Sequence, residues 1–370
     1  MKELHLSGSF YDMGVDYGKT FKKDIKLFSK FIYLMVSLCR QPGSTTFSPN
    51  MKYFLHSLFS LKKDKKKFRE GMVYFENTLK EYAPDMLEMI RGISEGSGLD
   101  LEDVMFLNMA TDVMMTCSIW GAHGEASKNK NTLIGMNADE SKEVEKYEIM
   151  IHMTPKSGKQ VKGSVMVGTV LLNHGMNEDG LAWAGTLFFL EIDGLIKGNI
   201  PLVVLQRPLY ECASVDEAMR LIDKLPNTNL GAVVYLGDSE QLVRYECSDD
   251  IRIKTIVENS VLGTTNLPEA EALRKKDLFK GYPDNKNLNA RHRHARMQDL
   301  ISQHEGDFDI DLMKKIASDH DLGGPHENMS MCQHGKFKTL VTYIADPSNR
   351  CFYINFGNPC KDAFKKYTFK

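Results

Sequence analysis

A cysteine and an aspartate stand near the two ends of one segment, which runs from Thr116 to Asp139 and reads TCSIWGAHGEASKNKNTLIGMNAD. Cys117 opens a short apolar run, a polar turn follows at residues 128–131, and a second apolar run leads to Asp139. Two such runs around a polar turn predict a β-hairpin. A hairpin returns the end of its second strand to the start of its first. We therefore expect Asp139 on the strand next to Cys117, with both side chains on one face of the sheet.

A cysteine at the start of a strand, with a carboxylate beside it, is typical of an N-terminal-nucleophile (Ntn) hydrolase. In this chemistry the chain cuts itself immediately before the nucleophile, and the freed α-amine becomes the base for the thiol of the same residue. The reference pKa of an α-amine, about 7.7–8.0, lies near that of a free thiol, about 8.5, so proton exchange between them is nearly balanced at neutral pH. The alternative is that Cys117 is a small buried apolar residue at a strand edge.

Length and composition are typical of a soluble globular protein. The 370 residues are 42% hydrophobic and 26% charged, and no linker or repeat divides them, so we expect one domain over residues 1–370. The formal net charge of -2 gives no reason to expect nucleic acid or an anionic membrane as a partner.

The cysteines and the N-terminus indicate a compartment. Seven scattered cysteines without a CxxC pair favour a reducing environment over a disulfide framework. The N-terminal residues lack the apolar segment of a secretory signal, and no run approaches the roughly 18 apolar residues of a membrane span. We expect a cytoplasmic protein.

Residues 1–116 have a mostly helical pattern. Gly14 and Gly18 predict close backbone packing, and apolar residues recur at helical spacing from 68 to 93, where Pro84 divides the run into two helices. Asp100 begins a further helix that leads to Cys117.

The rest of the chain alternates strands and helices. We expect an antiparallel meander over residues 147–190, a helix over 200–213, strands over 230–257, helices over 291–301 and 311–318, and a hairpin over 339–356. Strands in two blocks with helices between them predict an α+β fold of two stacked sheets flanked by helices.

Several stretches together resemble the acyl-coenzyme A:6-aminopenicillanic acid acyltransferase (isopenicillin N acyltransferase-like) family of Ntn hydrolases, over nearly the whole chain. They occur in the family's order and read LSGSFYDMGVDYG, TCSIWGAHG, TLIGMNAD, HGMNEDGLAWAG, IPLVVLQRPLYECASVDEA, GTTN, MSMCQHG, and TLVTYIADP with FGNPC. The resemblance implies a four-layer αββα sandwich.

The resemblance also implies a self-cleaving precursor. Scission of the Thr116–Cys117 bond would leave an α subunit, residues 1–116, and a β subunit, residues 117–370, which remain associated. The expected activity is cleavage of linear, non-peptide amides through a thioester on Cys117, or acyl transfer to an amine. No cofactor is implied. The expected partners are a small-molecule amide, or acyl-CoA as a co-substrate with an amine, and a homo-oligomer is compatible with the resemblance.

Three further site residues follow from the family's motifs. Asp139 matches the aspartate that orients the new α-amine, and Asn266 matches the asparagine whose amide holds the oxyanion, a contribution worth about 100- to 1000-fold in rate. A polar partner in the site matches an arginine of the RHRHAR run, where Arg291, Arg293 and Arg296 remain open and Arg293 is favoured. The alternatives are a turn residue for Asn266 and an exposed basic helix face for the arginines.

The chain departs from the family pattern at several positions. Many relatives have arginine in place of Met136, histidine in place of Leu267 and a serine near Ala290, and Thr116 stands where the penicillin enzyme has glycine. These differences leave the nucleophile in place but argue against a penicillin as the substrate. Three aromatic residues suit an apolar acyl chain, or else belong to the core: Trp120, Trp183 and Phe188.

Three other interpretations compete with this one. His320, His326, Cys332 and His334 are metal-ligand types at close spacing, but the spacing fits no zinc finger or ribbon, so we expect no metal. A papain-like enzyme with His334 as base lacks the matching cysteine signature. A catalytically idle binding protein of the same fold would not need to cut itself, so scission distinguishes it from an enzyme.

Overall fold

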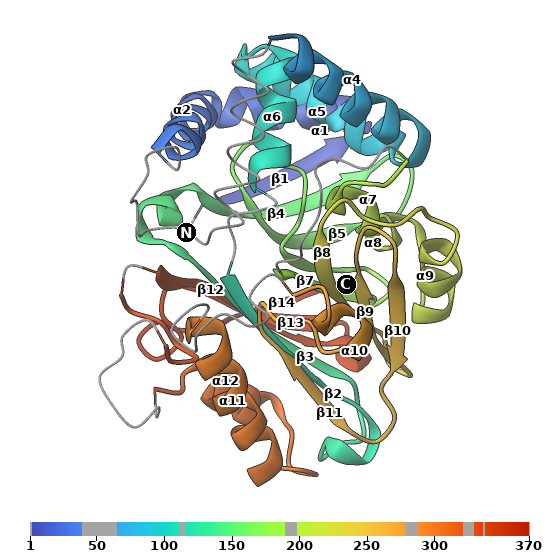
Figure 1. Ribbon diagram of the computed structural model, residues 1–370, viewed down its shortest axis with the longest axis vertical. Helices are drawn as coiled ribbons and strands as arrows, with labels where there is room; N and C mark the ends of the chain where they lie inside the picture. The colour runs from blue at the N-terminus through green and yellow to red at the C-terminus, as the bar shows by residue number, and fades with distance from the viewer. Residues whose placement is uncertain are drawn as a thin grey trace.

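The computed structural model describes residues 2–38, 65–111, 116–188, 198–277, 288–320, 329–335 and 337–369. The strands of these residues form an eight-stranded sheet, here called the large sheet, and a six-stranded sheet, the small sheet. Figure 1 shows the helices of the first third of the chain at one end of the molecule and two later helices at the other.

The N-terminal helices form the first layer. They are α1 (Phe10–Thr20), α2 (Lys22–Leu38), α4 (Lys65–Tyr82), α5 (Pro84–Ser97) and α6 (Leu101–Thr111). Pro84 starts α5, so the predicted division is confirmed. The predicted close packing is also confirmed, because a Cβ on Gly14 would lie 2.3 Å from Met89 O and one on Gly92 would lie 2.2 Å from Tyr11 O.

The large sheet has the strand order β1-β4-β5-β6-β7-β8-β9-β10. Its strands are β1 (Glu3–Gly8), β4 (Glu148–Pro155), β5 (Val161–Met166), β6 (His174–Asn177), β7 (Ala182–Phe188), β8 (Gly231–Gly237), β9 (Leu242–Cys247) and β10 (Arg252–Ile256). The run from β4 to β7 is the predicted antiparallel meander. Strand β1 was not predicted; it pairs with β4 in parallel.

The small sheet has the strand order β11-β2-β3-β12-β13-β14. Its strands are β11 (Val261–Thr264), β2 (Thr116–Ala122), β3 (Leu133–Ser141), β12 (Phe337–Asp346), β13 (Cys351–Phe356) and β14 (Lys365–Thr368). Strands β2 and β3 are the predicted hairpin, and β12 and β13 are the predicted terminal one.

The remaining helices are short, apart from α11 (Leu288–Gln303). The others are α7 (Leu202–Leu205), α8 (Pro208–Glu211), α9 (Val215–Ile222), α10 (Glu271–Arg274), α12 (Ile310–Ala317) and the 3-10 turns Gly124–Ala126, Lys142–Tyr147 and Pro347–Asn349. The prediction of one helix over 200–213 is wrong, because Pro208 has no N–H with which to continue α7 and instead begins α8.

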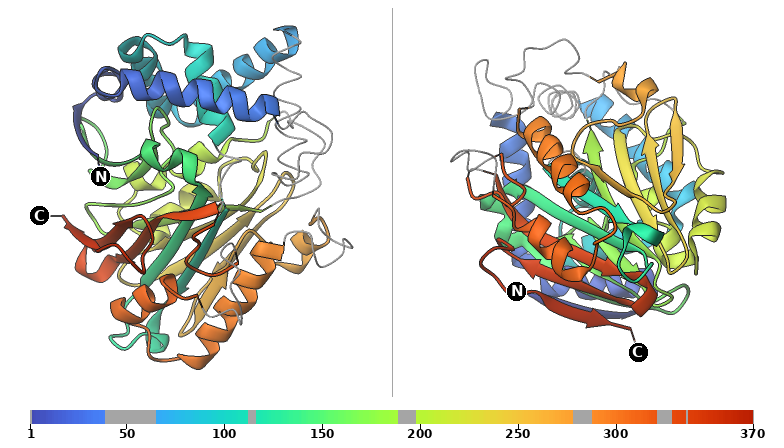
Figure 2. Two further views of the ribbon diagram at one scale, coloured as in Figure 1. Left: turned by 90° about the vertical axis from the view of Figure 1, so that its left-hand side faces the viewer. Right: turned by 90° about the horizontal axis from the view of Figure 1, so that it is seen from below.

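These elements stack as helix, sheet, sheet and helix. Helix α1 packs on β1 and β4, strands β2 and β3 pack on β7 of the large sheet, and α11 and α12 cover the other face of the small sheet. Figures 1 and 2 show the same succession from different sides. The predicted α+β class and four-layer αββα sandwich are confirmed. The main apolar core lies on the large-sheet side of the small sheet.

Candidate active site

The hairpin of β2 and β3 brings Cys117 and Asp139 to neighbouring strands, as predicted. Its register pairs Thr116 with Asp139 and Cys117 with Ala138. Because paired residues share a face and side chains alternate along a strand, Cys117 and Asp139 point to opposite faces of the small sheet. The expectation that both side chains lie on one face is therefore wrong. The thiol faces the large sheet, and the carboxylate faces helices α11 and α12 on the other side of the small sheet.

The Cys117 thiol is fully buried between the two sheets. Burial raises the pKa of the thiol far above its usual range, and the charge of Asp139 adds to this, while a hydrogen bond with Thr186 of β7 opposes it. The backbone of Cys117 is held separately, since its N–H donates to Asn266 Oδ1 over 3.0 Å.

Asn266 follows β11 and links the two sheets. Its Oδ1 accepts from Cys117 N–H and, over 3.1 Å, from Arg293 Nη2. Its Nδ2 donates to Thr186 Oγ1 over 3.1 Å and to Leu187 O over 2.8 Å. An oxyanion donor must point an N–H at the reacting oxygen. In this arrangement the Asn266 amide would have to turn from Thr186 to do so.

Arg293 of α11 is completely buried and reaches the backbone of the nucleophile candidate. Its Nη1 donates to Cys117 O over 2.8 Å and to Ser118 Oγ over 2.5 Å, and its Nε donates to Asn289 Oδ1 over 2.8 Å. Asp139 Oδ2 lies 3.5 Å from Nη1, and both side chains are 0% exposed. A buried guanidinium is tolerated only when its N–H groups have acceptors, and Arg293 has them in these oxygens, with Asp139 as the nearby opposite charge.

The structure brings Arg293 into the site. Arg296, three residues along the helix, pairs with Asp319 over 2.8 Å. Arg291 is half-buried on the same helix. The favoured residue of the three is the one that contacts Cys117.

Asp139 is held from a second side by the neighbouring strand. Its Oδ1 accepts from Thr339 Oγ1 of β12 over 2.5 Å, and Thr339 Oγ1 accepts from Gln333 N–H over 2.9 Å. Burial raises the pKa of Asp139 to about 6, although the Arg293 charge and the Thr339 bond act in the opposite direction. The carboxylate is therefore ionised at neutral pH but close to its titration range.

Sequence reasoning missed several polar residues of this network: Ser118, Thr186, Asn289, Gln333 and Thr339. Only Ser118 had a local signal, because a residue adjacent to Cys117 in a strand must face the opposite way. The others come from elements far away in the chain, and only the fold brings them together.

Two buried glutamates on the thiol side were also missed. Burial raises the pKa of Glu140 well above its ordinary value and that of Glu148 to about 7. Glu140 contributes to raising the pKa of Cys117. Of the two, Glu140 is therefore the acid that acts on the thiol from this face.

An apolar cavity lies along β7 and β8, and its lining includes Thr186 and Leu187 but neither Cys117 nor Asn266. Its other lining residues are Leu171, Leu172, Asn173, Trp183, Gly185, Leu202, Leu205, Ala232, Val233 and Val234. Of the aromatic residues considered for an acyl site, Trp183 lines this cavity. Trp120 lies on the opposite face of the small sheet, where its Nε1 donates to Met313 Sδ over 2.9 Å, and Phe188 is part of the main core.

The sequence of the chain agrees with one protein family. The family model described as acyl-coenzyme A:6-aminopenicillanic acid acyl-transferase matches residues 126–361, well over half of the chain. The chain belongs to this family. Its class, the Ntn amidohydrolases and acyltransferases, is therefore the class of this enzyme, and the family assignment replaces the papain-like alternative. The match includes Asp139, Asn266 and Arg293 and begins after Cys117.

Several solved structures are similar at low sequence identity. A variant of the conjugated bile acid hydrolase from Clostridium perfringens is 15% identical, with 69% of this chain and 97% of that chain covered and a TM-score of 0.40. A Caenorhabditis elegans ortholog of N-acylethanolamine-hydrolyzing acid amidase is 12% identical, with 63% and 93% covered and a TM-score of 0.45. Penicillin V acylase from Agrobacterium tumefaciens is 15% identical, with 66% and 77% covered and a TM-score of 0.35. No curated protein matches.

Two other features concern the remaining predictions. Among the described residues, no helix is both long and apolar enough to cross a membrane. Three of the residues considered as metal ligands, His320, Cys332 and His334, lie together with Cys360, whereas His326 falls outside the described residues.

Proposed function

We propose that this family member is a self-cleaving Ntn amidohydrolase and acyltransferase whose nucleophile is Cys117. The observation that carries the proposal is the pair of hydrogen bonds that hold the backbone of Cys117. Asn266 accepts its N–H and the buried Arg293 donates to its carbonyl oxygen, while the thiol points away toward Thr186. A merely structural cysteine does not need its two backbone groups held by an asparagine and an arginine from distant elements.

The same geometry supports scission before Cys117. The Cys117 sulfur attacks the Thr116 carbonyl carbon, the carbon–nitrogen bond breaks, and the nitrogen takes a proton to become the α-amine of Cys117. Water then hydrolyses the thioester, which frees the thiol and the Thr116 carboxylate. Asn266 Oδ1 already accepts from this nitrogen, so it can hold the new amine in place.

The role we propose for Asp139 differs from the one that the family motif suggests. Its carboxylate lies on the face of the small sheet that α11 covers, together with Arg293, and there it balances the buried guanidinium. Arg293 in turn holds the Cys117 carbonyl. Asp139 therefore acts on the α-amine through Arg293 and the backbone, as a positioning residue.

Turnover would use the same groups. The thiol passes its proton to the α-amine and attacks the substrate carbonyl, and the amine then protonates the leaving nitrogen. The resulting thioester passes its acyl group to water or to an acceptor amine. Nucleophile and base belong to one residue, so this mechanism requires no cofactor, and acyl-CoA enters only as an alternative acyl donor.

The apolar cavity supports an apolar acyl group on a linear amide. Its wall includes Thr186, whose hydroxyl contacts both Asn266 and the Cys117 thiol, and otherwise consists mostly of leucine, valine and tryptophan side chains. Burial of such a group contributes about 0.8 kcal/mol per CH₂. Affinity should therefore increase with acyl chain length until the cavity is filled.

We also propose that the two fragments stay together after scission. The main core mixes residues from before position 117, such as Met13, Ile90 and Leu107, with later ones such as Ile149 and Val233. Separating the fragments would expose this core to water.

The test is to trap the acyl-enzyme. Purified protein is incubated with N-acyl amides of increasing chain length, and with acyl-CoA plus amines, and the acyl adduct is located by peptide mass mapping. The expected adduct lies on Cys117 and is absent in Cys117→Ala, while Cys212→Ala, a buried cysteine near α9, keeps both adduct and turnover. Turnover that survives in Cys117→Ala, or none across both panels, would refute the proposal.

A further inference from the structure

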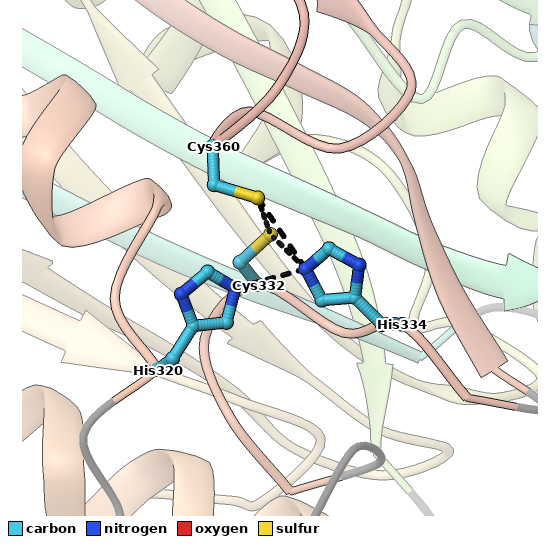
Figure 3. A group of neighbouring side chains, drawn as sticks. All are labelled: His320, Cys332, His334 and Cys360. Atoms are coloured by element: carbon cyan, nitrogen blue, oxygen red, sulfur yellow. Dashed lines mark hydrogen bonds between the residues drawn. The ribbon is translucent and has the colours of Figure 1, made fainter.

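Two cysteines and two histidines converge near the start of β12 and the end of β13, outside the candidate active site (Figure 3). His320 lies beyond the end of α12, Cys332 and His334 lie in the segment 329–335, and Cys360 follows β13. One donor atom from each residue lies within 4.8 Å of each of the others. All four are ligand types that bind zinc.

The distances between these atoms correspond to a tetrahedron around one ion. With Zn–S of about 2.3 Å and Zn–N of about 2.0–2.1 Å, a tetrahedral site separates two sulfurs by about 3.8 Å, a sulfur and a nitrogen by about 3.6 Å and two nitrogens by about 3.3 Å. Here Cys332 Sγ and Cys360 Sγ are 3.7 Å apart, and each lies 3.4 Å from His334 Nε2. The Nε2 atoms of His320 and His334 are 2.8 Å apart, so the exposed His320 ring would move outward by about half an ångström.

We propose that His320, Cys332, His334 and Cys360 form a structural tetrahedral site for a divalent cation of the zinc type. Four protein ligands close the coordination sphere, which is typical of structural rather than catalytic zinc. Asn358 Nδ2 also lies 3.5 Å from Cys332 Sγ as a hydrogen-bond donor, a contact that supports a thiolate ligand. A disulfide is the competing use of the two cysteines, but their sulfurs are well beyond the bonding distance of about 2.05 Å.

A bound metal would fix the position of the segment 329–335, which contacts the candidate active site. Gln333 stands between two of the ligands, and its Oε1 accepts from Asn289 Nδ2 over 2.7 Å. Its N–H donates to Thr339 Oγ1, which donates to Asp139. Asn358 Nδ2 also donates to Gln333 O over 2.6 Å. A metal that fixes the positions of Cys332 and His334 would therefore also fix Gln333 and its hydrogen bonds toward Asp139. This link between the metal and activity rests on the proposed function, whereas the metal site itself does not.

Metal content and cobalt substitution test the site. The full chain is purified under reducing conditions without chelators, and we expect about one zinc per chain in the wild type and in Cys117→Ala. Cobalt(II) added to metal-free protein should give the intense sulfur-to-cobalt charge-transfer absorption of a tetrahedral thiolate site. Cys360→Ser should lose both signals, while Cys351→Ser, on the adjacent strand β13, should keep both.

His320→Asn is a second variant, in case Cys360→Ser loses metal only because it misfolds. His320 is exposed, so its replacement should leave the fold intact. Loss of a hydrogen-bond partner of a metal ligand typically lowers metal affinity by about 10- to 100-fold. Because His320→Asn removes a ligand itself, the zinc affinity of this variant should fall by more than that. The proposal is wrong if metal-free wild type takes up neither zinc nor cobalt, if Cys360→Ser retains wild-type metal content, or if Cys332 and Cys360 are found disulfide-bonded. Because metal content is measured in Cys117→Ala as well, failure of the catalytic proposal would leave this result intact.

Discussion

Replacing Asp139 by asparagine should make the fold more stable at neutral pH while it impairs catalysis. The pKa of Asp139 is raised from 3.8 to about 6, mainly by burial. The folded state therefore holds the proton more tightly than the unfolded state. The stability that the protonated form contributes is fully present below pH 3.8 and is lost as pH rises through about 6. At about 1.4 kcal/mol per pKa unit, the ionised carboxylate costs the folded protein about 3 kcal/mol at neutral pH.

Asparagine has nearly the same shape and carries no charge, so it avoids this cost. It disturbs the hydrogen bond from Thr339, a loss of about 1 kcal/mol. We expect Asp139→Asn to raise the free energy of unfolding by about 2 kcal/mol near pH 8. This gain should be smaller by about 1 to 2 kcal/mol near pH 5, where most of the wild-type carboxylate is already protonated in the folded state.

The assay is urea unfolding at the two pH values, with both proteins carrying Cys117→Ala so that neither chain cuts itself. Turnover of Asp139→Asn alone should fall, because Arg293 loses the charge that balances it. The contrary result is also well defined. If the ion pair is a net stabiliser, removing one partner should destabilise the fold by about 3–5 kcal/mol at neutral pH, and our reasoning would be refuted.

Three further predictions concern the site and the helix layer. Asn266→Ala should slow turnover by about 100- to 1000-fold through loss of an oxyanion donor, and should also slow scission, because Oδ1 accepts the Cys117 N–H; unchanged rates of both in kinetic and mass assays would contradict this. The turnover rate of wild type should fall as pH drops through about 6, where Asp139 takes up a proton, and a rate that stays flat from pH 8 to pH 5 would exclude this role. Gly92→Ala should lower the melting temperature, because its Cβ would lie 2.2 Å from a backbone oxygen of α1. Gly71→Ala in α4, where nothing lies within 4 Å of the added Cβ, should instead raise the free energy of unfolding by up to about 1 kcal/mol. Equal effects of the two substitutions would show that the helices adjust freely.

The elements that carry the site could be predicted because their signals are local. A polar turn between two apolar runs indicates the β2–β3 hairpin, and Pro84 marks the start of α5. Ser214 caps α9 by accepting from Glu217 N–H, and the spacing of these two residues is itself a local signal. The position of Arg293 on a helix also followed from the sequence, although its burial did not.

The side of the sheet on which each residue lies could not be predicted. A shift of one residue in register moves every side chain of a strand to the other face. The connection between β2 and β3 includes a 3-10 turn at Gly124–Ala126, so its length does not fix the register from the sequence. The pairing of Cys117 with Ala138, and not with Asp139, therefore emerges only from the folded structure.

Contacts between distant segments were beyond the sequence patterns as well. Strand β1 is short, and its partner β4 lies far along the chain, with Glu3 beside Met150. Cys360 joins the histidine and cysteine cluster because strands β12 and β13 fold back on each other. Neither partner has a signal within its own window of sequence.

Intact mass measurement of freshly purified protein tests the central claim, that Cys117 becomes an N-terminal nucleophile by cutting its own chain. We predict two polypeptides that copurify, the second beginning at Cys117, for the wild type, and one full-length folded chain for Cys117→Ala. Cys117→Ser should cut slowly or not at all, because a hydroxyl is much harder to deprotonate than a thiol. An uncut wild-type chain that still turns over amides, or a Cys117→Ala chain still cut between residues 116 and 117, would contradict the claim.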